Sequence, residues 1–150
     1  MAERWPDLAG RIEGPVHVLP VRVYYEDTDF SGFVYHASYL RFCERGRSDW
    51  LRLIGIHHHE LERAEPGGAG FVVRRMVCDF LKPARIDEVL EVETRMAQVS
   101  GARLGLDQRV VRGGEILFQA AVTAALLDGR GRPRRLPKGL VAALSSPARS

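Results

Sequence analysis

The sequence predicts an α+β domain in which one long helix packs against an antiparallel sheet of five strands. A first segment, Val16–Tyr25, alternates apolar and polar residues like a half-buried strand. From about residue 36 apolar residues recur with the period of a helix, and after residue 70 four further segments have strand-like patterns. One amphipathic helix with antiparallel strands is a two-layer α+β architecture.

The predicted helix begins near His36 and ends before Gly55, which follows the last apolar residue and suits a helix C-terminus. Its apolar residues share one face: Leu40, Cys43, Trp50, Leu51 and Ile54. Gly46 lies in the middle of this helix, where glycine costs about 1 kcal/mol relative to alanine. We therefore expect the helix to approach the sheet closely at Gly46.

Four strands are predicted after the helix, over Phe71–Lys82, Val89–Met96, Arg103–Arg112 and Ile116–Leu126. The Gly113-Gly114 pair is a typical two-residue hairpin turn. Short connections predict that the last three strands are antiparallel neighbours. Residues 139–144 can form a short terminal helix.

The 150 residues predict one domain, with a loose leader at 1–15, a folded unit at 16–144 and a tail at 145–150. One helix cannot cover a five-stranded sheet, so we expect self-association through the sheet or its edges.

Composition restricts the function classes. The net charge of +3 is uneven, because residues 1–127 carry −2 and residues 128–150 carry +5. No secretory signal and no membrane-spanning apolar run is evident. Cys43 and Cys78 have neither disulfide-framework nor zinc-site spacing, which favours a reducing cytoplasm.

The densest polar cluster is the acidic turn of Glu26, Asp27 and Asp29, directly before Gly32 and the start of the helix. Free N–H groups at a helix start can polarise a carbonyl oxygen, and a nearby carboxylate can attack that carbonyl or activate a water. Alternatively, the carboxylates cap the helix or bind local amides. The residues alone leave both interpretations open.

Other candidates point to chemistry less specifically. His36 at the helix start can act as a general acid, orient a carboxylate or simply pack, and the tyrosines around it are typical of packing: Tyr24, Tyr25, Tyr35 and Tyr39. The His57-His58-His59-Glu60 run lacks the spacing of a metal motif and predicts a solvated loop.

Basic residues gather near the C-terminus, at Arg130, Arg132, Arg134, Arg135 and Lys138. Guanidinium groups suit phosphate oxygens, whereas proline, glycine and the lack of interleaved aromatics argue against nucleic-acid binding. A solvated loop or a contact with a phosphorylated small ligand remain the alternatives.

Three stretches resemble a known family, the YbgC-like acyl-CoA thioesterases associated with the Tol-Pal system, in the 4-hydroxybenzoyl-CoA thioesterase group of the hotdog fold. They are Val21–Asp29, Gly32–Leu40 and Glu44–Arg47. The resemblance covers roughly residues 17–144 and also includes Phe71–Met76, Lys82–Glu88 and Arg134–Lys138.

The resemblance implies a hotdog sheet wrapped around the helix, and edge-to-edge dimers that commonly pair into tetramers. It assigns the catalytic carboxylate to Asp29, and both oxyanion stabilisation by the backbone N–H and an active-site side chain to His36. It implies substrate-binding roles for Gly32, Val34 and Tyr35. Tyr25 and Glu44 are further candidates near the site, and Arg134, Arg135 and Lys138 are candidates for coenzyme A phosphate contacts.

These observations predict a cytoplasmic hydrolase that cleaves acyl-CoA to a free acid and coenzyme A, without a metal or cofactor. The alternative is a non-catalytic module that binds acyl-CoA or acyl carrier protein for cell-envelope machinery. Phe30 and Ser31 stand where many family members have small residues, which is expected to affect the choice of substrate.

Overall fold

The computed structural model describes residues 4–56 and 69–145. The strands are β1 (Arg11–Glu13), β2 (Val16–Arg22), β3 (Ala69–Phe80), β4 (Val89–Ser100), β5 (Arg103–Arg112) and β6 (Glu115–Asp128). The helices are a short 3-10 turn, η1 (Tyr25–Asp27), the long α1 (His36–Leu53) and the terminal α3 (Lys138–Ser145).

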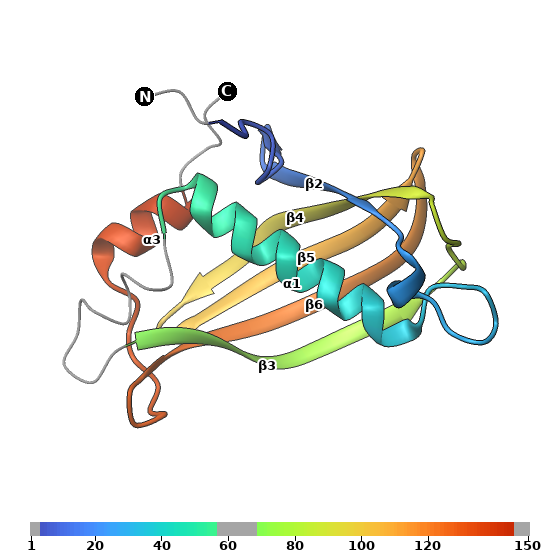
Figure 1. Cartoon of the computed structure of the whole chain (residues 1–150). Helices are drawn as coiled ribbons and strands as arrows, with labels where there is room; N and C mark the ends of the chain where they lie inside the picture. Colours follow the sequence, from blue (N-terminus) through green and yellow to red (C-terminus); the bar gives the residue numbers. More distant parts are fainter. Residues whose placement is uncertain (1–3, 57–68, 146–150) are drawn as a thin grey trace.

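The strands form one antiparallel sheet in the order β1-β2-β4-β5-β6-β3. Figure 1 shows α1 lying across one face of this curved sheet. The predicted adjacency of the last three strands is confirmed, and β5 and β6 join through Gly113 and Gly114, both with positive φ. This is the hotdog arrangement that the resemblance implies.

The prediction of five strands was one too few. The additional strand, β1, lies within the predicted leader and pairs antiparallel with β2, opposite Val16–Val18. Gly14 adopts a φ of +58° in the turn between them, a conformation that glycine favours. Three residues are too few to show a period of two, so the sequence pattern gave no sign of this strand.

The core lies between α1 and the sheet. Alternate residues of β4 point inward, so that Leu90, Val92 and Thr94 are buried, while α1 contributes the buried Phe42 and Trp50. Burial of such apolar side chains is the main stabilising contribution to the fold.

The close approach predicted at Gly46 is confirmed. A Cβ atom at this position would lie 2.8 Å from Val92 Cγ1 and 3.1 Å from Thr94 Oγ1. Any side chain here would push α1 away from β4, so glycine fixes the height of the helix above the sheet.

Within the described residues, no helix has the length and apolar character needed to cross a membrane.

Candidate active site

The two aspartates of the acidic turn, Asp27 and Asp29, differ in burial and in their hydrogen bonds. Asp27 is buried, and its carboxylate accepts a hydrogen bond of 2.8 Å from the amide of Tyr24. Its carbonyl oxygen accepts bonds from the amide of Tyr35 (2.8 Å) and the hydroxyl of Ser38 (3.0 Å). These hydrogen bonds join the acidic turn to the start of α1. Asp27 therefore has a structural role, which was one of the two interpretations of the acidic turn.

Asp29, in contrast, is exposed. One carboxylate oxygen, Oδ1, accepts hydrogen bonds from the amide of Ser31 at 2.8 Å and from its hydroxyl at 2.5 Å. These bonds lower the pKa of Asp29, and the nearby His36 lowers it further. The carboxylate is thus ionised at neutral pH and held in one orientation.

The chain returns sharply from Asp29 to the helix. The amide of Asp29 donates to the carbonyl of Phe33, Thr28 pairs with Val34, and Gly32 has a φ of +82°. This tight loop brings Asp29 to the first turn of α1, although seven residues separate it from His36.

The first turn of α1 offers free hydrogen-bond donors. The side chain of the N-cap residue, Tyr35, makes no capping bond. In the part of the chain that the structure describes, the amides of His36 and Ala37 have no acceptor. Such amides carry the partial positive charge of a helix N-terminus and suit a developing oxyanion.

Aromatic rings surround the His36 side chain. Its ring centroid lies 4.4 Å from that of Tyr35 and 6.1 Å from that of Phe80, at the end of β3. Tyr39 stacks on Phe118 with the ring centroids 5.2 Å apart. Phe80 was missed as a site candidate, because its proximity to His36 depends on the place of β3 in the sheet, where it pairs with β6.

A shallow pocket of about 470 Å³ opens beside Asp29. It is lined by Tyr25, Thr28, Asp29, Phe30, Gly32 and Ile86. The structure therefore brings together Asp29, Gly32 and Tyr25. Val34 is buried beneath the loop, and Tyr35 remains 40% exposed.

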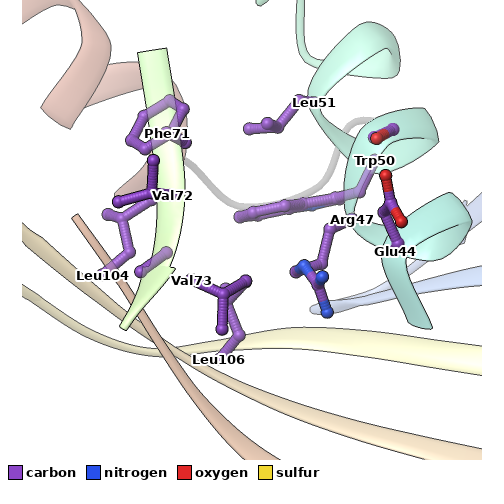
Figure 2. Close-up of a pocket in the computed structure, with 11 residues that line it drawn as sticks. Glu44, Arg47, Trp50, Leu51, Phe71, Val72, Val73, Leu104 and Leu106 are labelled. Atoms are coloured by element: carbon purple, nitrogen blue, oxygen red, sulfur yellow. The ribbon is translucent and has the colours of Figure 1, made fainter. Parts of the chain in front are cut away.

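Glu44 lies at a second pocket, about 12 Å further along α1 by the rise of a helix. This pocket has a volume of about 310 Å³ and lies between α1 and the first half of β3 (Figure 2). Two of its residues, Arg47 and Trp50, were not predicted as site residues.

The basic segment lies at the other end of the subunit. It follows β6, whose last residue, Asp128, pairs with Ala69 at the start of β3, whereas His36 lies near Phe80 at its end. The twelve residues of β3 span roughly 36 Å at about 3.3 Å per residue. Arg134, Arg135 and Lys138 are therefore remote from Asp29 within one chain (Figure 1).

The histidine run His57–His59 and Glu60 fall outside the described residues. Among the residues that are described, no group of three or more histidine, cysteine or acidic side chains is arranged to hold a metal ion.

Comparison with known proteins places this geometry in a family. Residues 23–144 match the model of the thioesterase-like superfamily. The chain is 44% identical over 126 residues to the acyl-CoA thioester hydrolase YbgC of Escherichia coli O6:H1, covering 82% of this chain and 91% of that protein. It is 42% identical over 125 residues to the acyl-CoA thioesterase YbgC of Haemophilus influenzae, covering 83% and 90%.

A solved structure agrees with this relationship. The crystal structure of a probable thioesterase from Bartonella henselae superposes with a TM-score of 0.78 at 45% identity, covering 81% of this chain and 99% of that one. The chain therefore belongs to the thioesterase-like superfamily and, within it, to the YbgC family of hotdog proteins.

Proposed function

We propose that this protein hydrolyses acyl-CoA thioesters to a free carboxylic acid and coenzyme A, with Asp29 as the catalytic carboxylate. The observation that carries the proposal is the position of an ionised, oriented carboxylate beside the unpaired amides that begin α1. The names of the YbgC relatives support the same reaction.

In the proposed reaction, the thioester carbonyl oxygen accepts a hydrogen bond from the amide of His36. As negative charge develops on that oxygen, the helix N-terminus stabilises it. Asp29 either attacks the carbonyl carbon, forming an anhydride that water then cleaves, or removes a proton from an attacking water. In both routes the carbon–sulfur bond breaks, and the thiolate of coenzyme A takes up a proton as it leaves.

The remaining site residues have supporting roles in this proposal. The His36 side chain positions the substrate or Asp29, and the rings of Tyr35 and Phe80 lie beside it. Tyr25 and Gly32 line the approach to Asp29, and the buried Val34 supports the loop.

The working unit in this proposal is a dimer. β3 lies at an edge of the sheet, and Val72, Val73, Val77 and Phe80 on it are 41–51% exposed. A long edge strand with exposed apolar residues favours pairing with another chain. Because a two-fold axis makes identical edge strands antiparallel, the start of β3 in one subunit meets its end in the other. Further pairing of such dimers gives the tetramer.

This symmetry supports a role for the basic segment. The dimer would bring Arg134, Arg135 and Lys138 of one subunit towards the end of the partner that carries the partner's Asp29. The phosphates of coenzyme A are anions that arginine and lysine bind well. We therefore propose that the two ends of β3, which are remote from each other within one chain, are brought together between subunits.

We place the reaction in the cytoplasm, since Cys43 and Cys78 are free thiols and thus fit a reducing compartment. Acyl carrier protein is a second thioester carrier in the proposal, because an acyl-acyl carrier protein thioesterase of Arabidopsis thaliana is 29% identical to this chain over 126 residues.

The experiment is thiol release from a panel of acyl-CoAs that differ in chain length and aromatic character, with the free acid measured in parallel. We expect equal amounts of thiol and acid, above the background rate, for at least one substrate. If the protein binds acyl-CoA but releases no thiol from any member, it is the non-catalytic binding module instead.

A further inference from the structure

The pocket beside Trp50 contains a positive charge in largely apolar surroundings. Its apolar wall is formed by Trp50, Leu51, Phe71, Val73, Leu104 and Leu106. Arg47, Glu44 and Ser48 form a polar side on α1. Figure 2 shows Trp50 reaching from α1 towards β3. With a volume of about 310 Å³, the pocket is large enough for a small organic group.

Arg47 is held in place by a buried hydrogen-bond network. Its Nη1 atom donates to Gln108 Oε1 at 2.9 Å, and Gln108 is only 1% exposed. The amide nitrogen of Gln108 donates to Thr94 Oγ1 and to the carbonyl of Cys43, both at 2.9 Å. The guanidinium is therefore fixed by groups on β5, β4 and α1, and not by solvent alone.

Among the described residues, Arg47 forms no direct ion pair, although the nearby Glu44 carboxylate interacts with its charge and raises its pKa. Within residues 4–56 and 69–145, no carboxylate forms an ion pair with it. Glu44 lines the same pocket but is exposed, and Figure 2 shows its carboxylate pointing in a different direction from the guanidinium. Burial lowers the pKa of Arg47, although a guanidinium still remains protonated. The charge of Glu44 offsets only part of the cost of burying this cation, and an anionic ligand that bonds the guanidinium directly lowers that cost further.

The position of the pocket connects it to the reaction. Phe71 and Val73 belong to the first half of β3, whereas Phe80, which contacts His36, ends that strand. In the proposed dimer, the first half of β3 pairs with the second half of the partner's strand. The pocket of one subunit therefore faces the reacting end of the other.

We propose that this pocket receives the acyl group of the substrate and that Arg47 selects acyl groups ending in a carboxylate. The inference rests on the proposed function and adds a substrate class to it, the ω-carboxyacyl-CoA thioesters. Arg47 presents parallel N–H donors, which match the two oxygens of a carboxylate. The methylene groups of such a substrate would contact the apolar wall.

The test compares glutaryl-CoA with pentanoyl-CoA, which have the same number of acyl carbons but differ in the terminal carboxylate. We expect the wild-type protein to have a kcat/KM about tenfold or more higher for glutaryl-CoA, the typical value of a charge-assisted contact. Arg47→Met should remove that preference by lowering kcat/KM for glutaryl-CoA about tenfold, while changing the value for pentanoyl-CoA less than about twofold.

Two further variants make the result interpretable. Arg109→Met removes an arginine that lines a separate pocket with Asp107 and Glu93. This control variant should leave kcat/KM unchanged for both substrates. Arg47→Lys keeps the positive charge but lacks the two parallel N–H donors of a guanidinium, so it should retain part of the preference for glutaryl-CoA. This variant tests the contact if Arg47→Met does not fold.

The outcomes separate the two proposals. If the wild-type protein cleaves pentanoyl-CoA as well as or better than glutaryl-CoA, the role of Arg47 is wrong and the hydrolase function stands. The role is also wrong if a folded Arg47→Met protein has a kcat/KM that is lowered equally for both substrates. If neither substrate nor any other acyl-CoA releases thiol, the proposed function itself fails.

Discussion

The hydroxyl and amide of Ser31 both donate hydrogen bonds to Oδ1 of Asp29, at 2.5 and 2.8 Å. A serine two residues after the carboxylate therefore orients the group that we propose to be catalytic. These bonds favour the ionised form and lower the pKa of Asp29. From the sequence, Ser31 is notable only as a residue that stands where many family members have smaller ones. Its hydrogen bonds to Asp29 show that this difference affects the pKa of the proposed catalytic carboxylate.

Replacing Ser31 by alanine should raise the pKa of Asp29 towards its ordinary value of 3.8, because the largest lowering contribution, the hydroxyl bond, is lost. The reaction needs the ionised carboxylate, so the acid limb of the pH profile of kcat/KM should move to higher pH. The measurement is that profile for both proteins below pH 6. An acid limb that stays in place would show that Ser31 does not control Asp29.

Replacing Gly46 by alanine should destabilise the fold, although alanine is the better helix former. The new Cβ would lie 2.8 Å from Val92 Cγ1, and such overpacking costs about 1–3 kcal/mol. Unfolding in urea measures the change. Gly139→Ala in α3 is the matched control, because a Cβ there meets nothing within 4 Å. Equal stability of both variants would contradict the close contact.

The protein should become less stable in mild acid because of the protonation of His17. The side chain is fully buried, its Nε2 bonds the carbonyl of Ala9 at 2.7 Å, and its Nδ1 has no partner among the described residues. Burial is the main cause that lowers its pKa below the ordinary 6.5, partly offset by Ala9 and Asp49. The unfolded chain thus binds a proton more readily, and stability should fall as the pH drops below about 6.5.

The measurement for His17 is the urea midpoint between pH 5 and 7.5. His17→Gln keeps a donor for the Ala9 carbonyl but cannot titrate, so its midpoint should depend less on pH in this range. Identical pH dependence in the two proteins would rule out a contribution from His17.

Replacing Val77 by lysine should weaken the proposed dimer. Val77 lies on the edge strand β3 and is 49% exposed, so the substitution would place a charge in the interface. Sedimentation should show a smaller species, and thiol release should fall because the proposed site is completed by the partner. Val89→Lys, with a similarly exposed valine on the inner strand β4, is the control. A Val77→Lys monomer with full activity would refute the shared site.

Local patterns predicted much of this fold. The period of α1 and the Gly113-Gly114 turn follow from neighbours in the chain, and an unfavourable glycine inside the helix indicated the close approach at position 46. All three were confirmed. The short strand β1 was not predicted, because three residues carry no measurable period.

The site was predicted only in part, for a related reason. Asp29, Gly32 and His36 lie within one short loop and helix start, so their proximity is local. Phe80 approaches His36 only through the pairing of β3 with β6, and Arg47 meets Gln108 only because α1 crosses β5. A sequence pattern does not contain these long-range contacts. The distance of Arg134 from Asp29 likewise became evident only from the sheet order.

The most direct test of the central claim is the rate of thiol release by Asp29→Asn, with Asp107→Asn as the control. Asp107 is an exposed aspartate on β5, away from the start of α1. Asparagine keeps the shape of Asp29 but is neither a nucleophile nor a base, so kcat should fall about 10²–10⁴-fold. Asp107→Asn should retain the wild-type rate. Full activity in a folded Asp29→Asn protein would contradict the account, since the reaction would then not use this carboxylate.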